Sequence, residues 1–271
     1  MFYLSGNDFP QSAKSLHASL LESLRTFFTL PADDRPVVSV GGGDYPALER
    51  IRVDLTGVKV DAGQPPPKPV GVGERRPGPS ARTLEISGHP IRILGAGIQL
   101  ELAADEVQFA YGRDARGRPL LLLETAKSGE VDVQIRNADL EALLLTQANA
   151  LAAQHGVTIE QAAVELTPVD PRTVTAAVRV TVKKLVARAP LTIRGRISID
   201  DALNATFSEL SCHGEGIVGG LAGSVIRPYL DRFQNAQVPL AAVSLGAVHL
   251  HHLTIDADGA ALRVKAGFGA P

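Results

Sequence analysis

Strict alternation of apolar and polar residues constrains the fold of this chain more than any other feature. It is longest in "TVTAAVRVTVKKLVARAPLTIRGRISID", residues 173–200, where valines and then leucine and isoleucines recur at alternate positions. Because residues two apart point to the same side of a strand, each half of this stretch predicts a strand with one apolar face. Strands joined by a short tip, here near 184–190, pair antiparallel, since parallel pairing requires a long crossover. We therefore expect a long two-stranded ribbon.

Shorter alternating segments occur along the rest of the chain. One is "ERIRVDL" at 49–55, a series follows between 83 and 136, and a final pair of strands flanks "DADG". Residues at helical spacing predict three amphipathic helices, over 12–28, 137–156 and 217–236. The predicted fold class is α+β, with a large antiparallel β-sheet wrapped around these helices.

A proline-rich segment interrupts the N-terminal half. Residues 62–82, "AGQPPPKPVGVGERRPGPSAR", hold six prolines, which suit neither a helix nor a central strand. We predict a loop or linker there, within a single domain over 1–271. A pseudo-repeat of 1–130 and 131–271 is an alternative organisation of the same domain.

The composition narrows the classes of partner. A net charge of -2 provides no general attraction to nucleic acid, and an aromatic content of 4% without tryptophan disfavours stacking platforms for bases. Cys212 is the single cysteine, so neither a disulfide framework nor a thiolate metal cluster is expected. Since we see no signal peptide and no transmembrane run, we expect a cytoplasmic protein able to dock peripherally on membranes, unless a leader has been removed.

Two motifs invite interpretation as ligand sites. "GEGIVG", Gly214 to Gly219, matches the dinucleotide-binding pattern, but it follows a polar segment and lacks a βαβ context. We interpret its glycines as allowing a helix to start close to a strand. In "VHLHHLTI", His249 and His251 could share a metal on one strand face, yet the apolar phase changes at His251 and His252, which favours a β-bulge.

No group of residues forms a convincing catalytic site. Cys212 precedes His213, but sequence neighbours on a strand point apart, and a lone cysteine is usually a small buried hydrophobe. We predict no enzymatic activity, no cofactor and no metal.

The C-terminal half resembles the LmeA-like phospholipid-binding family, which is related to the tubular lipid-binding (BPI-like) proteins. The likeness covers about 130–268 and includes "IRNADLEALLLTQANALAAQHGVTI", "LTPVDPRTVTAAVRVTV", "APLTIRGRISID" and the closing "VPL…DADG…LRVKAG". The resemblance implies a long curved antiparallel sheet around a helix and an apolar groove for acyl chains. It implies binding, and in some settings transfer, of phospholipid or another acyl-chain lipid.

The apolar stripes of the second and third helices provide candidate groove residues. Small residues in both helices leave room beside an aliphatic sheet, although they are also compatible with tight helix packing. The predicted lipid-binding residues are Leu140, Leu144, Ala148, Leu151, Val218, Leu221, Val225 and Tyr229.

The ribbon is also a candidate membrane contact. Residues 172–196 contain seven basic residues and no acidic one, and apolar residues lie at the tip. Such an arrangement suits an anionic bilayer, but a solvated sheet face would have the same pattern. The predicted membrane contacts are Lys183, Lys184, Leu185, Val186 and Arg188. The alternative function is a structural or protein-interaction module without lipid, and no oligomeric state is predicted.

Overall fold

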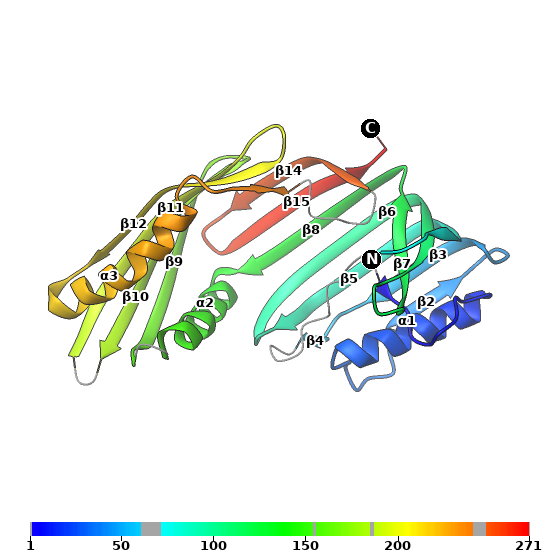
Figure 1. Cartoon of the computed structure of the whole chain (residues 1–271), viewed down its shortest axis with the longest axis horizontal. Helices are drawn as coiled ribbons and strands as arrows, with labels where there is room; N and C mark the ends of the chain where they lie inside the picture. Colours follow the sequence, from blue (N-terminus) through cyan, green and yellow to red (C-terminus); the bar gives the residue numbers. More distant parts are fainter. Residues whose placement is uncertain (1, 61–71, 154–155, 185–186, 241–247, 271) are drawn as a thin grey trace. The chain divides into compact units, whose positions relative to one another are not determined.

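The computed structural model describes residues 2–60, 72–153, 156–184, 187–240 and 248–270. The chain divides into two compact units (Figure 1). Unit 1 comprises Met1–Val133, Val243–His252 and Lys265–Pro271, and unit 2 comprises Gln134–Ala242 and Leu253–Val264. The predicted pseudo-repeat boundary at 130 falls close to the boundary at Val133. The single domain over 1–271 stays a prediction.

The boundaries between the units fall within three strands. They are β8 (Ser128–Arg136), β14 (His249–Ala257) and β15 (Ala261–Gly269). The fold class is α+β, as predicted, and the described residues form one ten-stranded and one five-stranded sheet. The larger sheet has the order β14-β15-β8-β6-β5-β3-β2, with β7 also on β6, β4 on β5 and β1 on β7.

Unit 1 combines one helix with most of the larger sheet. Its strands are β1 (Phe2–Tyr3), β2 (Val38–Gly41), β3 (Ala47–Asp54), β4 (Lys59–Val60), β5 (Arg76–Ile93), β6 (Ala96–Arg113) and β7 (Pro119–Thr125). The helix predicted over 12–28 is confirmed as α1 (Ala13–Phe27), and Ser12 and Ser15 form a capping box at its start. Its Leu16, Leu20 and Leu24 are buried in the core, as the apolar stripe predicted.

Part of the proline-rich segment is a strand, which corrects the loop predicted over 62–82. Residues 61–71 lie outside the described residues, but β5 begins at Arg76. Pro77 pairs with Ala110 of β6, and the register shifts between Pro77 and Ser80. The pairing of β5 with β3 starts only at Ser80, so Pro77 and Pro79 lie before the part of β5 that has a neighbouring strand on both sides. Proline is compatible with a one-sided, bulged strand end.

The sheet is mixed rather than wholly antiparallel, a second correction. β3 and β4 both pair with β5 in parallel, for example through Ile51 and Leu84.

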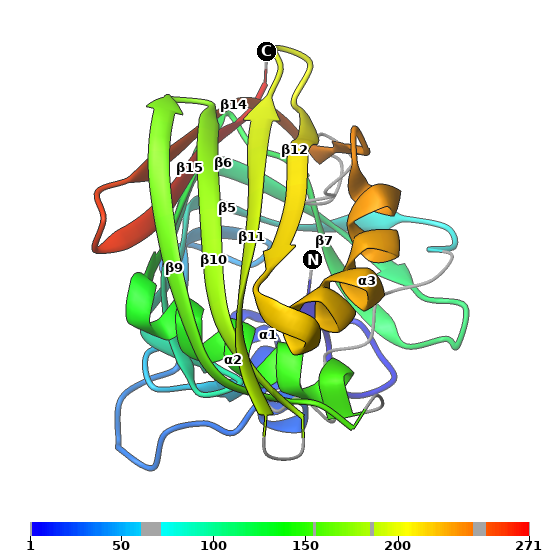
Figure 2. The ribbon, with the colours of Figure 1, turned by 90° about the vertical axis from the view of Figure 1, so that its left-hand side faces the viewer.

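Unit 2 contains the smaller sheet, whose order is β13-β12-β11-β10-β9 (Figure 2). Its strands are β9 (Thr158–Asp170), β10 (Thr173–Lys184), β11 (Ala187–Ile199), β12 (Asn204–Gly214) and β13 (Gln237–Pro239). The predicted ribbon is confirmed, because β10 and β11 pair antiparallel from Thr173↔Ser198 to Lys184↔Ala187. β10 ends at Lys184, where the predicted tip begins, and β11 begins at Ala187, within the range predicted for the tip.

Two helices belong to unit 2, α2 (Asn137–Ala152) and α3 (Gly216–Phe233). The structural interpretation of "GEGIVG" is confirmed at the start of α3. A Cβ on Gly214, the last residue of β12, would overlap the carbonyl of Gly219, and Gly216 has a φ of +67°. β12 lies between antiparallel neighbours, so the parallel βαβ context of a dinucleotide site does not occur there.

Candidate functional site

The predicted groove residues of α2 lie together on one side of the helix. Leu140, Leu144 and Ala148 recur every four residues and are all half-buried, while Ala142, Thr146 and Ala150 on the opposite side are exposed. The side chain of Leu151 lies outside the described residues. This part of the helix presents an aliphatic surface that the described protein covers only partly.

The predicted groove residues of α3 cannot be compared in the same way. The side chains of Val218, Leu221, Val225 and Tyr229 lie outside the described residues. The described part of α3 packs Ile226 and Leu230 against the sheet, beside a cluster of Val180, Val182, Leu191 and Cys212. A Cβ on Gly223 would lie 3.9 Å from the Cys212 sulfur, an ordinary van der Waals distance, so this position of α3 faces the sheet.

The smaller sheet has one apolar face, and the two helices cover different parts of it. α3 packs on β12, β11 and β10, whereas α2 packs on β9. Between them, aliphatic side chains that share the inward face with Val180 remain half-buried. They are Ala162, Val164 and Leu166 of β9, Val178 of β10, and Ile193 and Ile197 of β11.

Polar side chains of α2 fix this helix along the free edge of β9. The Asn149 amide donates to the Ile159 carbonyl (2.8 Å) and accepts from the Ile159 amide (2.8 Å). Glu141 accepts a hydrogen bond from the Val164 amide (2.8 Å). These bonds satisfy backbone groups that an edge strand would otherwise leave unpaired, and they set the distance between α2 and the apolar face.

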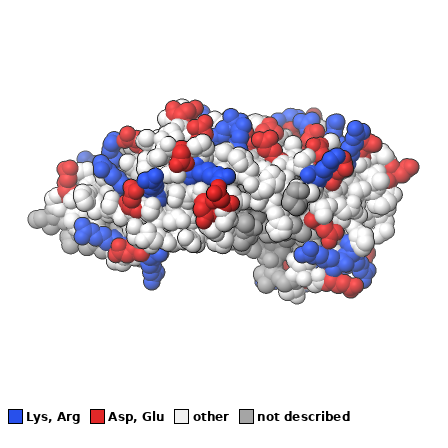
Figure 3. Space-filling view, turned by 90° about the horizontal axis from the view of Figure 1, so that it is seen from above, with Lys and Arg blue, Asp and Glu red and all other residues white. Residues whose placement is uncertain are grey.

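The positive charge of the ribbon is offset by carboxylates from neighbouring strands. Glu160 of β9 forms ion pairs with both Lys183 (3.4 Å) and Arg188 (2.8 Å), and the hydrogen bond from Arg188 lowers the pKa of Glu160. Further ion pairs are Arg172–Asp201, Arg179–Glu165 and Arg196–Glu209. Figure 3 shows basic and acidic side chains intermixed on one face of the molecule. The Lys184 side chain, Leu185 and Val186 lie outside the described residues.

The histidine stretch shows the predicted change of phase. Val248 is buried and Leu250 half-buried, then Leu253 and Ala257 are buried, while His251 and His252 between them are both exposed. A Cβ on Gly267 of β15 would lie 2.9 Å from the His251 ring and 3.7 Å from His252 Cβ, so both histidines lie against one glycine. The described residues contain no group of three side chains able to hold a metal.

Cys212 is placed as a core residue. It is buried in the cluster under α3, and this burial raises the pKa of its thiol, which disfavours the nucleophilic thiolate. The ring nitrogen Nδ1 of His213 lies 3.1 Å from the Cys212 carbonyl oxygen, so this contact involves the cysteine backbone.

Sequence reasoning missed two polar clefts. One, of about 660 Å³ in unit 1, is lined by Asp8, Phe9, Gln11, Glu74, Arg76 and Arg113. The other, of about 460 Å³, lies over the sheet of unit 2. Neither set of lining residues includes a predicted lipid-binding residue. For the second cleft, the sequence feature that could have indicated a site is the set of arginines on the polar face of the ribbon.

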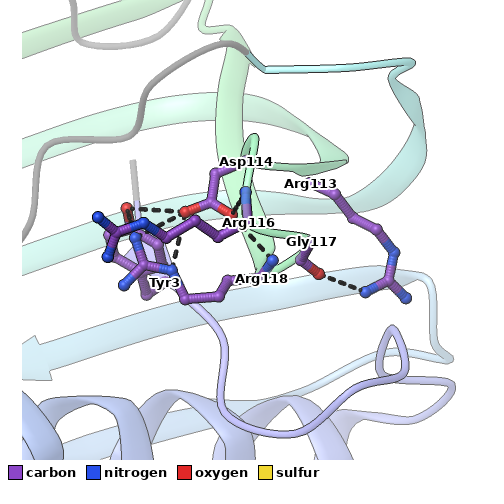
Figure 4. A network of polar contacts seen from close by, with 6 residues as sticks. All are labelled: Tyr3, Arg113, Asp114, Arg116, Gly117 and Arg118. Carbon is purple, nitrogen blue, oxygen red and sulfur yellow. Dashed lines mark hydrogen bonds and ion pairs between the residues drawn. The ribbon is translucent and has the colours of Figure 1, made fainter.

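A buried carboxylate organises the turn beside the first cleft (Figure 4). Asp114 accepts hydrogen bonds from the Arg116 and Arg118 amides and from the Arg118 guanidinium (2.8 Å), which stacks on the Tyr3 ring at 4.4 Å. Burial would raise the pKa of Asp114, but these donors outweigh it and the pKa falls below its usual value. All the bonding capacity of Asp114 is used locally, which marks it as a structural group.

Within the described residues, no helix is both long enough and apolar enough to cross a membrane. No protein-family model, curated protein or solved structure was found to match this chain.

Proposed function

We propose that this protein binds a phospholipid or another acyl-chain lipid without catalysing a reaction. The bound chain lies along the apolar face of the smaller sheet, between α2 and α3. In this proposal unit 2 is a relative of the LmeA-like and tubular lipid-binding proteins.

The observation that supports this most is the incomplete burial of aliphatic side chains in unit 2. Leu140 and Leu144 of α2 and Val164 of β9 are half-buried, although they belong to the apolar faces of their elements. A lipid chain laid over them would remove methylene and methyl groups from water, at about 0.8 kcal/mol for each methylene. Leucine, valine and isoleucine form a surface without directional polar groups, which suits acyl chains.

The ribbon contributes less to this function than the apolar face does. The ion pairs of Glu160 with Lys183 and Arg188 reduce the charge available to an anionic bilayer. We therefore place the specificity for lipid in the apolar face and give the ribbon an auxiliary role.

Two neighbouring residues of β9 allow a matched test. Val164 faces the apolar side and Ala163 the solvent side, as their registers with Val178 and Arg179 show. Val164→Gln places an amide where the acyl chain lies and should lower lipid retained through purification by about tenfold, since an unpaired buried amide costs about 1–3 kcal/mol. Ala163→Gln should retain lipid at the wild-type level.

Lipid is measured by organic extraction and mass spectrometry, and cooperative melting shows that each variant is folded. Ala148→Trp, which fills the space beside α2, should also lose lipid. Equal lipid content in all three variants and the wild type would rule out this face as the site. Absence of lipid from the wild type would favour a protein-interaction module.

A further inference from the structure

The polar cleft of unit 2 lies on the opposite face of the sheet from the proposed lipid. It has a volume of about 460 Å³ and is lined by Glu165, Thr167, Thr175, Ala176, Ala177, Arg179, Arg194, Gly195, Glu209 and Ser211. These residues come from β9, β10, β11 and β12. Since a water molecule occupies about 30 Å³ in the liquid, the cleft has room for a small organic molecule and not only for an ion.

The middle of the cleft is low because small residues flank one arginine. Arg194 of β11 pairs laterally with Ala177 of β10 and Ser211 of β12. The register of β11 and β12 then shifts, and Glu209 takes a φ of +55°, so β12 bulges beside Gly195. A Cβ on Gly195 would lie 2.6 Å from Leu210 Cδ2, so this close packing holds the bulge in place.

The charges of the cleft leave one guanidinium without a carboxylate. Glu165 is paired with Arg179 (2.9 Å) and Glu209 with Arg196 (3.2 Å). Among the described residues, exposed Arg194 has neither an ion-pair nor a hydrogen-bond partner. The Ser211 hydroxyl beside it is likewise without a partner in the described part of the chain. The cleft lining holds Arg179 and Arg194 against Glu165 and Glu209, and because Arg196 from outside the lining pairs with Glu209, the Arg194 charge is left for a ligand.

We propose that this cleft binds a small hydroxylated phosphate monoester of the sugar-phosphate type. The Arg194 guanidinium presents parallel N–H donors that match two phosphate oxygens, and the Ser211 hydroxyl adds a third donor. Glu165 and Glu209, each held by its own arginine, accept hydrogen bonds from the hydroxyl groups of the ligand. The ligand is soluble, because side chains of the acyl-binding face point to the other side of the sheet.

Glucose 6-phosphate is the probe, titrated into the whole chain and followed by calorimetry and by the NMR signals of the arginine side chains. The wild type should bind it saturably at millimolar concentration or below. Inorganic phosphate should bind more weakly, and glucose should not bind. Arg194→Gln should weaken binding by at least about tenfold, the expected loss for a charge-assisted hydrogen bond, while the melting temperature stays unchanged.

Arg188→Gln is the matched control, because it removes the same charge from the same ribbon at a residue outside the cleft. It should bind glucose 6-phosphate like the wild type. Equal weakening in the two variants would overturn the proposal in favour of general charge attraction, and so would an absence of saturable binding by the wild type. Arg194-dependent binding to phosphatidylglycerol vesicles without binding to glucose 6-phosphate would overturn the assignment to a soluble ligand.

Discussion

The two units bury their apolar residues to very different degrees. Among the described side chains, the largest that are fully buried all belong to unit 1, apart from Leu191. The large hydrophobic side chains that are clearly exposed, Val169, Phe233 and Val238, all belong to unit 2. Unit 1 uses its apolar surface for its own core, whereas unit 2 keeps an aliphatic face in partial contact with solvent. The comparison teaches that the same α+β architecture can close its core in one unit and leave aliphatic side chains partly exposed in the other.

Two phenylalanines give the largest contrast. Phe268 of unit 1 is fully buried, and its ring occupies the space where a Cβ on Gly129 would lie. Phe268→Ala should therefore destabilise the protein by about 3–5 kcal/mol. Phe233 of unit 2 is 55% exposed and lies edge-on to Phe207, at 6.5 Å between ring centroids. Phe233→Ala should cost about 1 kcal/mol or less. Urea unfolding followed by circular dichroism measures both, and similar costs would remove the contrast.

The same Leu→Ala substitution in a helix of each unit compares their burial directly. Leu20 of α1 is 2% exposed, and Leu144 of α2 is half-buried. Leu20→Ala should cost about 2–5 kcal/mol, because it leaves a cavity. Leu144→Ala should cost about 1 kcal/mol in lipid-free protein, since much of its side chain is already in contact with water. If Leu144→Ala lowered the free energy of unfolding as much as Leu20→Ala, the Leu144 side chain would belong to a fully packed core.

The smallest expected effect concerns the surface charge of unit 2. Glu160→Gln frees Lys183 and Arg188 from their carboxylate and should increase flotation with anionic vesicles at low salt, because each freed basic residue contributes about 1 kcal/mol near such a surface. High salt should abolish the increase. Glu165→Gln, which frees Arg179 away from the tip, is the control and should have less effect. If Glu160→Gln floats like the wild type, the ribbon does not contribute to membrane binding.

The pKa of Glu160 adds a pH dependence to this last effect. Because the hydrogen bond from Arg188 lowers that pKa, Glu160 stays ionised as the pH falls through the usual glutamate range, and the ion pairs are lost only when the pH falls through the lowered value. The wild type should therefore approach the flotation of Glu160→Gln only in acid. An equal difference between the two proteins at every pH would show that the carboxylate does not titrate as described.

The local periodicity of the sequence predicted many helices and strands of each unit, but it could not predict which strands pair when they are distant in the sequence. The ribbon, α1 and the phase change at His251 and His252 depend on neighbouring residues, so the sequence pattern revealed them. The parallel ladder of β3 and β5 joins strands that lie across the proline-rich segment, and alternation alone does not define a partner. For the same reason the count of basic residues in the ribbon missed Glu160, which reaches it from β9.

The candidate sites divide in the same way. Helical spacing placed Leu140, Leu144 and Ala148 on one side of a helix, and all three lie in α2 as half-buried side chains, while their contact with lipid stays a prediction. The cleft around Arg194 was not foreseen, because it depends on the lateral register of four strands and on a bulge at Glu209.

Native mass spectrometry of the wild-type chain after mild purification tests the central claim most directly. If the aliphatic face of unit 2 binds an acyl chain, the spectrum should contain a species heavier than the chain by the mass of one lipid, and collisional activation should release that lipid. Val164→Gln should shift the population to the bare chain, and Ala163→Gln should not. A wild-type spectrum that shows the bare chain alone, both after purification and after incubation with phospholipid, would contradict the account.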